Sequence, residues 1–473
     1  MIGSSRFRIV FAASQITALM AVFLMLWLMP GAPVPDSLIG FSVVWAVTSC
    51  FYRLNPYRSR GGWWILLAVA VFLSLGIIAN IHVFTLPPGA DSSHPVFVNN
   101  DATLIWQRAV MLNGFSYDPD IASPDGPFGF ALFVAPVLQV FGCDIIYPLL
   151  INMLCVLMAV VMAGMLYVRT VRSSSGSTAA MLFLSVIAYF VCAGAILLKD
   201  APLSVSISAL MLGLTFVIRP STVTRLNIAA YSGIIISLIV MALCRAPMLL
   251  LAATGVVAVL WGRNKLGGYL PVAIILVVAG LLYISVMLLD YPVDTSVKAV
   301  AHFSDDVRST IFDAIEDTQK AYDPIRSLVG SSILTRMAFL PLSCVLQFLI
   351  PLPWNFMAHA AMGYTLIYAH IGFGWYVTGG IAAFGYIYGM RSMPAMLRRM
   401  AVWALAMYVL IAFMYDGTIS RYCLPFMPIW AVLAAWALRL GKEKPRKFRA
   451  WIVAYAFVMS VILLAAYFYT HAD

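Results

Sequence analysis

Long apolar runs recur along almost the whole chain, and they limit the folds that it can adopt. Runs close to or above 18 residues follow one another from Arg8 to the C-terminus. Each is long enough to cross a hydrocarbon core of roughly 30 Å as an α-helix. The strands of a transmembrane barrel alternate in polarity over about ten residues, so continuous runs argue against that architecture. The sequence therefore predicts an all-α polytopic membrane protein with roughly 11–14 transmembrane helices.

Charged residues are scarce, and their placement indicates topology rather than a nucleic-acid partner. Of 473 residues, 63% are hydrophobic and 10% are charged, whereas soluble domains carry about 25% charged residues. The net charge is +10, but Lys and Arg gather in short segments between apolar runs, as the positive-inside bias requires. The seven cysteines are scattered without a CxxC or Cys/His cluster. Neither a disulfide framework nor a structural zinc site is indicated.

The basic clusters all fall on one side of the membrane when each apolar run is treated as a span. We therefore expect a bacterial cytoplasmic (inner) membrane protein with a cytoplasmic N-terminus and a site that faces the periplasm or exterior. The first run, which ends near Pro30, is longer than a signal-peptide core, and we interpret it as a retained span. The clusters lie at residues 6–8, 53–60, 169–172, 219–225, 263–265, 391–399 and 439–449.

Two larger exoplasmic loops interrupt what we expect to be a single transmembrane domain over residues 1–473. The first spans 85–142 and ends in FGFALFVAPVLQVFG, which is apolar but short, so 128–142 is predicted to be a re-entrant or interfacial helix. The second spans 291–336, where apolar residues at near-helical spacing predict an amphipathic helix on the membrane surface.

Several charges break the positive-inside pattern at tight exoplasmic turns. Lys199 and Asp200 lie in LLKDAPLS, Arg245 lies in LCRAPML, and Asp416 and Arg421 lie in YDGTISRYCLP. Charges at the membrane boundary are functional candidates by default, although a single cation can also snorkel to the surface. Three cations on one face have a natural ligand in the phosphate of a membrane lipid, which Arg grips with two donors and Lys meets as a point charge.

The first loop supplies a candidate carboxylate. Glycosyl transfer needs a base that takes the proton of the acceptor hydroxyl, and Asp101 lies early in the loop, close behind a span. Asp118, Asp120 and Asp125 fall in a Pro/Gly-rich run, where Asp forms turns. Polar and aromatic residues elsewhere are candidate acceptor or sugar contacts: Asn100, Trp106, Tyr117, Asp200, His302, Arg308 and Asp416.

The sequence resembles the integral-membrane GT-C glycosyltransferases, which take sugars from polyprenyl-phosphate donors. The resemblance lies in YDPDIASPDGPFGFALFVAPVLQVFG and in GTISRYCLPFMPIW, and it covers 97–142 and 416–430. That group includes the protein mannosyltransferases, the lipid A aminoarabinose transferase and the phage serotype-converting glucosyltransferases. The resemblance implies that Asp101 is the catalytic acidic residue of the first loop. It also implies that Lys199, Arg245 and Arg421 contact the donor phosphate.

The resemblance also implies the partners: a polyprenyl-phosphate-linked sugar, a glycan, lipid or protein acceptor, and membrane lipids. No soluble cofactor is expected, because no Gly-rich phosphate loop follows a strand. Family members often carry an acidic pair, but here Asn100 precedes Asp101 and Ala102 follows. A lone carboxylate is a poor divalent site, so a metal is not indicated.

Two other functions stay open at this point. A Wzy-type polysaccharide polymerase or O-antigen ligase also has many spans and a large late loop, in which His302 and Arg308 would be the key groups. A flippase or transporter for lipid-linked sugars would carry polar residues at mid-membrane. The charges of this chain lie at the ends of spans, which argues against the flippase.

Overall fold

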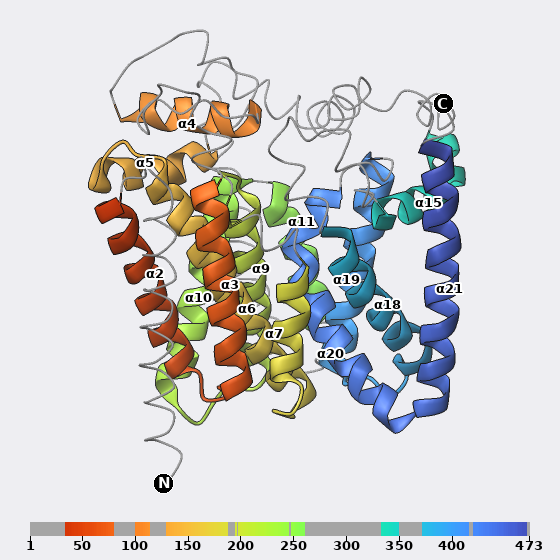
Figure 1. Ribbon diagram of the computed structural model, residues 1–473. Helices are drawn as coiled ribbons and strands as arrows, with labels where there is room; N and C mark the ends of the chain where they lie inside the picture. Colours follow the sequence, from red (N-terminus) through yellow and green to blue (C-terminus); the bar gives the residue numbers. More distant parts are fainter. Residues whose placement is uncertain are drawn as a thin grey trace, which may run out of the picture.

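The described part of the chain is a bundle of helices. The computed structural model describes residues 34–79, 100–113, 129–187, 194–195, 197–245, 247–260, 333–349, 371–415 and 420–470. Within these ranges it contains helices and no strands (Figure 1). The helices are α2 (Val34–Leu54), α3 (Arg60–Ala79), α4 (Asn100–Leu112), α5 (Gly129–Phe141), α6 (Ile146–Val171), α7 (Ser177–Val186), α9 (Asp200–Ile218), α10 (Thr224–Cys244), α11 (Pro247–Leu260), α15 (Ile333–Leu349), α18 (Ile371–Gly389), α19 (Ala395–Tyr415), the 3-10 helix η4 (Ser420–Phe426), α20 (Met427–Glu443) and α21 (Pro445–Thr470).

Seven helices of the described residues are long and apolar enough to cross a membrane, and five shorter apolar helices accompany them. The predicted all-α multi-pass architecture is confirmed. The first apolar run, which ends near Pro30, and a further apolar run at 268–290, which is also long enough to be a span, lie outside the described residues.

The basic clusters that the structure describes converge on one end of the bundle, which we call the basic end and which lies at the bottom of Figure 1. The clusters at 6–8 and 263–265 lie outside the described residues. It contains the turns 55–59, 172–176, 219–223, 390–394 and the junction of α20 and α21. Hydrogen bonds tie this end to neighbouring helices: Ser59 Oγ lies 2.7 Å from Thr178 Oγ1 of α7, and Lys444 Nζ donates to the carbonyl of Tyr388 of α18 at 3.3 Å.

The opposite end, at the top of Figure 1, carries the acidic residues, and we call it the acidic end. Five acidic residues occur in the described part of the chain. Asp36, Asp101, Asp144 and Asp200 lie in or next to the helix ends of the acidic end, and Glu443 alone lies at the basic end. The two ends therefore differ in charge, as they do in a helical protein with a fixed orientation in a membrane.

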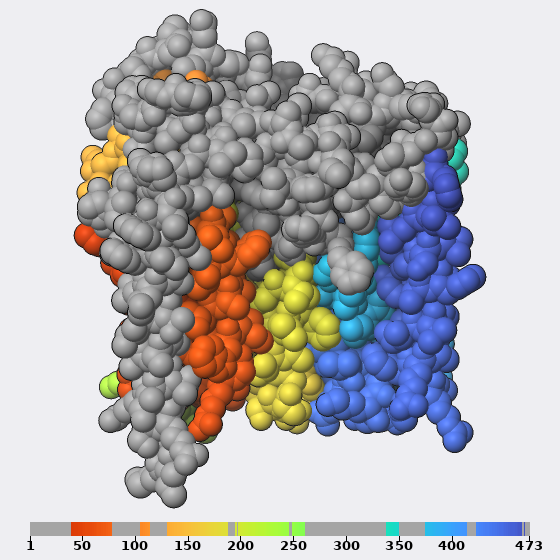
Figure 2. Space-filling view, in the orientation of Figure 1, coloured from red at the N-terminus to blue at the C-terminus, as the bar shows by residue number. Residues whose placement is uncertain are grey.

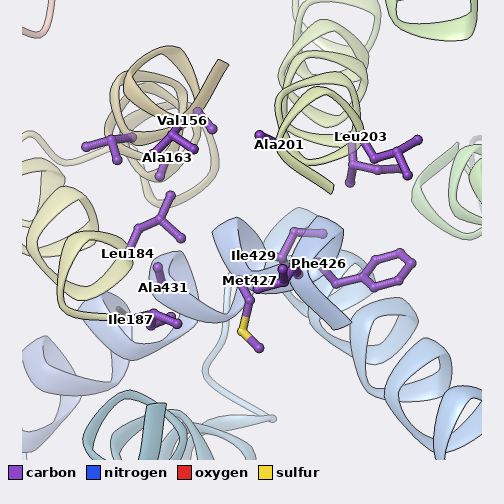
Figure 3. Packing of buried hydrophobic residues seen from close by; sticks show 14 of the residues in the cluster. Val156, Ala163, Leu184, Ile187, Ala201, Leu203, Phe426, Met427, Ile429 and Ala431 are labelled. Carbon is purple, nitrogen blue, oxygen red and sulfur yellow. The ribbon is translucent and has the colours of Figure 1, made fainter. Parts of the chain in front are cut away.

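The centre of the bundle is made by α6, α9 and α20. The span of α20 is 89% buried, whereas that of α21 is 6% buried. Small and branched side chains interdigitate in the centre, including Ala163 of α6, Leu184 of α7 and Ala431 of α20 (Figure 3). Outer helices such as α21 instead expose apolar side chains along the flank of the bundle (Figure 2), as expected for a surface that meets lipid tails.

Two short helices cover the acidic end. Helix α4 lies across this end above α5 (Figure 1) and packs against it, and the side-chain amide of Asn113 donates to the carbonyl of Ala135 at 3.0 Å. Helix α5 has 13 residues and contains Pro136, so its length of about 20 Å is short of a full crossing. The predicted re-entrant or interfacial position of α5 stays a prediction. Of the second loop, 291–336, the structure describes only residues 333–336 at the start of α15, so the amphipathic helix predicted there stays a prediction too.

One predicted span is shorter than expected. The apolar run at 179–198 predicts a continuous crossing, but α7 ends at Val186, and Ile187 has φ −75° and ψ 86°. The physical reason is the close approach of α18, because a Cβ placed on Gly374 would lie 1.6 Å from the carbonyl oxygen of Val186. The hydroxyl of Thr378 on α18 also donates to the carbonyl of Phe183 at 3.4 Å. Only glycine permits this contact.

We expect Gly374→Ala to destabilise the protein by about 1–3 kcal/mol, because the added methyl group overlaps a backbone carbonyl that cannot rotate away. Gly233→Ala on α10 is the matched control: nothing lies within 4 Å of its added Cβ, and alanine favours a helix by about 1 kcal/mol over glycine. Thermal unfolding in detergent measures both variants, and equal melting temperatures would refute the close-contact explanation.

Candidate functional site

The first turn of α9 holds the first pair of predicted site residues. Lys199 caps the helix and is half-buried, while Asp200 begins it and is 3% exposed. The amide of Leu203 donates to the carbonyl of Lys199 at 3.1 Å, and the hydroxyl of Ser204 donates to the carbonyl of Asp200 at 2.7 Å. A carboxylate in a first turn is favoured by the positive end of the helix dipole, which helps to explain how Asp200 is accommodated in a buried position.

A buried amide on α6 holds the segment that leads into α9. Asn152 Nδ2 donates to the carbonyl of Leu198 at 3.0 Å, and both residues are buried. A buried carbonyl outside a helix costs free energy when it lacks a donor. Asn152 supplies that donor and fixes the backbone immediately before Lys199.

Arg245 lies at the tight turn between α10 and α11. Its amide donates to the carbonyl of Met241 at 2.9 Å, and its own carbonyl accepts from the amide of Met248 at 2.8 Å. The guanidinium carbon of Arg245 lies 4.1 Å from the centroid of the Tyr422 ring. This is a cation–π contact, and it orients the plane of the guanidinium group.

These elements meet at one place on the acidic end. Lys199 and Asp200 lie near enough to the thiol of Cys244, the last residue of α10, to act on it electrostatically. Helix α9 also packs against η4, which contains Arg421 and Tyr422. The start of α9, the end of α10 and η4 therefore bring together Lys199, Asp200, Arg245 and the backbone of Arg421. The side chain of Arg421 lies outside the described part of the structure.

A second buried amide holds η4 in position. Gln347 Nε2 of α15 donates to the carbonyl of Tyr408 at 2.9 Å and contacts Cys423 Sγ at 3.1 Å. The hydroxyl of Tyr408 in turn donates to the carbonyl of Cys344 at 2.6 Å. These bonds join α15, α19 and η4 next to Tyr422. Sequence reasoning missed Gln347 and Tyr422, although a glutamine in an apolar helix and an aromatic residue beside Arg421 were visible signals.

Helix α4 contributes a buried arginine that sequence reasoning also missed. Asp101 lies in the first turn of α4, and Arg108 is 8% exposed and lies seven residues later. Seven residues are about two helical turns, so the two Cα positions share a face of α4. Trp106 is 4% exposed and belongs to the hydrophobic core; its contact with a sugar stays a prediction.

The remaining predicted site residues are not placed by the structure. Tyr117, His302, Arg308 and Asp416 lie outside the described residues, as do the side chains of Asn100 and Asp101. No group of His, Cys, Asp or Glu suited to a metal ion occurs among the residues that the structure describes.

We expect Gln347→Met to lower the melting temperature, because methionine fills a similar volume but cannot donate to the carbonyl of Tyr408 or to Cys423 Sγ; a lost hydrogen bond of this kind costs about 0.5–1.5 kcal/mol. Ser185→Ala is the control, since within the described residues its hydroxyl bonds to the carbonyl of Met181, one turn earlier in the same helix. Thermal unfolding in detergent compares the two. A Gln347→Met protein as stable as Ser185→Ala would show that the amide does not hold η4.

No protein-family model matches the sequence, and no curated protein matches it. Comparison of structures finds three-dimensional similarity to two integral-membrane proteins. ArnT from Cupriavidus metallidurans in the apo state is 17% identical with a TM-score of 0.48, over 86% of this chain and 65% of that chain. The same protein bound to undecaprenyl phosphate is 16% identical with a TM-score of 0.45 over the same shares.

The apo oligosaccharyltransferase of Archaeoglobus fulgidus is 13% identical with a TM-score of 0.46, over 87% of this chain and 55% of that chain. This chain thus spans less than two thirds of the length of the proteins it resembles. ArnT and the oligosaccharyltransferase are both under 20% identical to this chain, with TM-scores below 0.5, so the similarity concerns the helical fold alone.

Proposed function

We propose that this protein is a glycosyltransferase that moves a sugar from a polyprenyl-phosphate carrier to a glycan, lipid or protein acceptor on the exoplasmic side of the bacterial inner membrane. The observation that supports the proposal is the gathering of Lys199 and Arg245 beside η4 at the acidic end. This end lies opposite the clusters of Lys and Arg that mark the cytoplasmic side of membrane proteins.

The two cations suit the phosphate of a lipid donor. Both groups lie at helix ends, where the headgroup of a lipid would lie if its chain ran along the bundle. Arg245 is oriented by Tyr422, so less side-chain entropy is lost when its N–H groups engage a phosphate. Charge-assisted hydrogen bonds of this kind are roughly twice as strong as neutral ones.

Asp200 has a supporting task in this scheme. Asp200 directly follows Lys199 and is buried, and in this scheme its negative charge offsets the repulsion between the cations before the donor binds. It also supplies acceptor atoms for hydroxyl groups of the transferred sugar. The arrangement keeps a cationic site folded in the absence of its ligand.

In the proposed reaction, the base is the carboxylate that the sequence indicates in the first loop. Asp101 takes the proton from the acceptor hydroxyl while the hydroxyl oxygen attacks the anomeric carbon of the sugar. The bond from that carbon to the phosphate oxygen breaks, and the polyprenyl phosphate leaves with the electron pair. Lys199 and Arg245 stabilise the charge that develops on this leaving group. The scheme requires no divalent ion, because the two cations neutralise the phosphate.

We expect Lys199→Gln and Arg245→Gln each to weaken binding of undecaprenyl phosphate about 10-fold, which corresponds to about 1.4 kcal/mol for one lost charge-assisted contact. Arg225→Gln removes the same charge at the basic end and serves as the control. A labelled undecaprenyl phosphate titrated against purified protein in detergent measures the affinity. Equal affinities for all three variants and the wild type would refute the assignment of the phosphate contacts.

We expect Asp101→Asn to lower sugar transfer at least about 100-fold, because the amide cannot accept the proton, while undecaprenyl phosphate still binds. Asp144→Asn is the control: Asp144 Oδ1 accepts from the amide of Ile146 at 2.9 Å, and an asparagine oxygen can replace it. Transfer is measured with a panel of undecaprenyl-phosphate sugars.

Other outcomes would move the assignment to a different class of protein. Near-normal transfer by Asp101→Asn, with loss in His302→Ala, would favour the polymerase or ligase of diphosphate-linked chains. Sustained translocation of the lipid by purified protein, without transfer of sugar, would favour the flippase.

A further inference from the structure

Three arginines meet at the basic end where α6 and α9 finish. Arg169 Nε donates to Thr215 Oγ1 at 3.1 Å, and its Nη2 donates to the carbonyl of Thr215 at 3.0 Å and to the carbonyl of Arg219. Its guanidinium carbon also lies 4.0 Å from the centroid of the Phe216 ring. Arg169 therefore has a fixed orientation, and it ties the end of α6 to the end of α9.

The other two arginines lie beside it and are exposed. Arg172 caps α6 in the left-handed conformation, with φ 59°, and Arg219 directly follows α9 in an extended conformation. Partial desolvation, and then the positive charges of Arg172 and Arg169, lower the pKa of the Arg219 guanidinium. Arg219 is thus close enough to Arg169 and Arg172 to be repelled by their positive charges.

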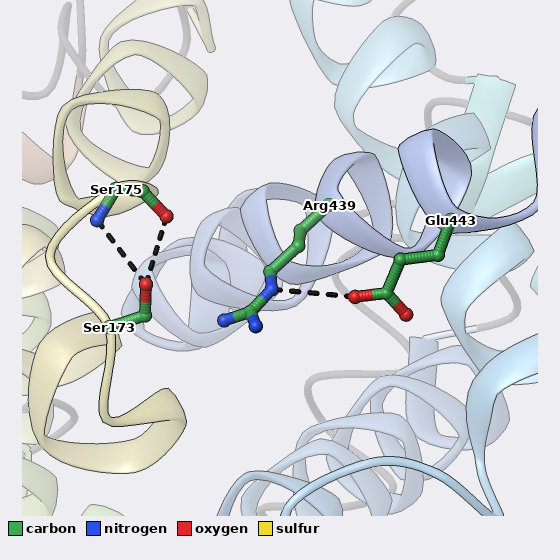
Figure 4. A network of polar contacts seen from close by, with 4 residues as sticks. All are labelled: Ser173, Ser175, Arg439 and Glu443. Atoms are coloured by element: carbon green, nitrogen blue, oxygen red, sulfur yellow. Dashed lines mark hydrogen bonds and ion pairs between the residues drawn. The ribbon is translucent and has the colours of Figure 1, made fainter.

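No carboxylate of the described residues offsets this repulsion. Glu443 is the one acidic residue that the described structure places at the basic end, and it pairs with Arg439 at 3.6 Å (Figure 4). Helix dipoles supply little compensation: α6 and α9 end here with a partial negative charge of about 0.5 each, but α7 and α10 begin here with equal positive charges. The cluster keeps a surplus of positive charge.

We propose that Arg169, Arg172 and Arg219 form a binding site for the phosphate of an anionic phospholipid. Arg169 and Arg219 lie within two residues of the ends of α6 and α9, which is the level of the headgroups for helices that span the bilayer. Basic pockets between transmembrane helices on the cytoplasmic side bind anionic headgroups in this way.

Neighbouring groups suit the rest of such a lipid. The hydroxyls of Ser173 and Ser175 lie 2.9 Å apart immediately after Arg172 and are accessible to solvent (Figure 4), so they can donate to a headgroup. On α10, which begins five residues after Arg219, Ile228 and Tyr231 are exposed and offer apolar surface to an acyl chain. This combination favours a phospholipid over a free phosphate ion.

The test compares two double variants with the same change in charge at the same end. Arg172→Gln/Arg219→Gln removes two members of the cluster, and Arg446→Gln/Lys447→Gln removes two exposed cations from the start of α21. Labelled phosphatidylglycerol or phosphatidylcholine is added to the full-length protein in detergent micelles, and its binding is measured. We expect the wild type and the α21 variant to bind phosphatidylglycerol at least 10-fold more tightly than phosphatidylcholine. We expect the Arg172/Arg219 variant to lose that preference.

The same experiment contains the results that would overturn the proposal. If both double variants lost the preference for phosphatidylglycerol equally, the lipid would be bound by the diffuse charge of the basic end rather than by the arginine cluster. If the wild type bound phosphatidylglycerol and phosphatidylcholine equally, there would be no such site. Displacement of phosphatidylglycerol by millimolar inorganic phosphate would show a free-anion site. If the double variant does not fold, Arg219→Gln alone can be measured instead, and it should lose a smaller part of the preference for phosphatidylglycerol. Because the readout is phospholipid binding, its result is independent of the proposed sugar transfer.

Discussion

The hydrocarbon interior of a membrane offers no hydrogen bonds, and this constraint determines where the chain can place polar groups. Backbone groups are satisfied within helices, and non-helical backbone is tolerated only where protein encloses it. Two segments of the candidate site, the turn before α9 and the short 3-10 helix η4, interrupt the regular α-helices and are enclosed by protein in this way. Each is held by one buried amide from another helix, Asn152 and Gln347 respectively. The site therefore depends on contacts made below it in the bundle.

The same constraint moves charge to the two ends of the helices and allows the ends to differ. Arg245 at the acidic end stacks on Tyr422, and Arg169 at the basic end stacks on Phe216. The two contacts are chemically alike, but their surroundings are not. Asp200 accompanies the first cation cluster, whereas the described residues place no carboxylate beside the second. A buried carboxylate suits a site that binds and releases its ligand. A cluster without one suits a resident anion.

The sequence was sufficient to predict the helical class and the end at which Lys199, Asp200 and Arg245 lie, because apolar run length and charge placement are local properties. It was not sufficient to predict which helices touch. The early end of α7 depends on Gly374, and the position of η4 depends on Gln347. In both cases the contacting residues lie far apart in the sequence, and no local sequence pattern links them. Arg108 was visible as a charge, but its burial follows from the packing of α4 on α5.

The surplus of Lys and Arg at the basic end, against the mixed charges of the acidic end, gives the described bundle a permanent dipole along its long axis. A membrane potential acts on such an arrangement with about 2.3 kcal/mol per elementary charge moved across 100 mV. In an energised membrane with a negative cytoplasmic side, the field draws the basic end inward and the acidic end outward. Chains inserted in the reverse direction would work against the field as well as against the insertion machinery. The distribution of a few side chains thus couples the orientation of the protein to the energy state of the cell.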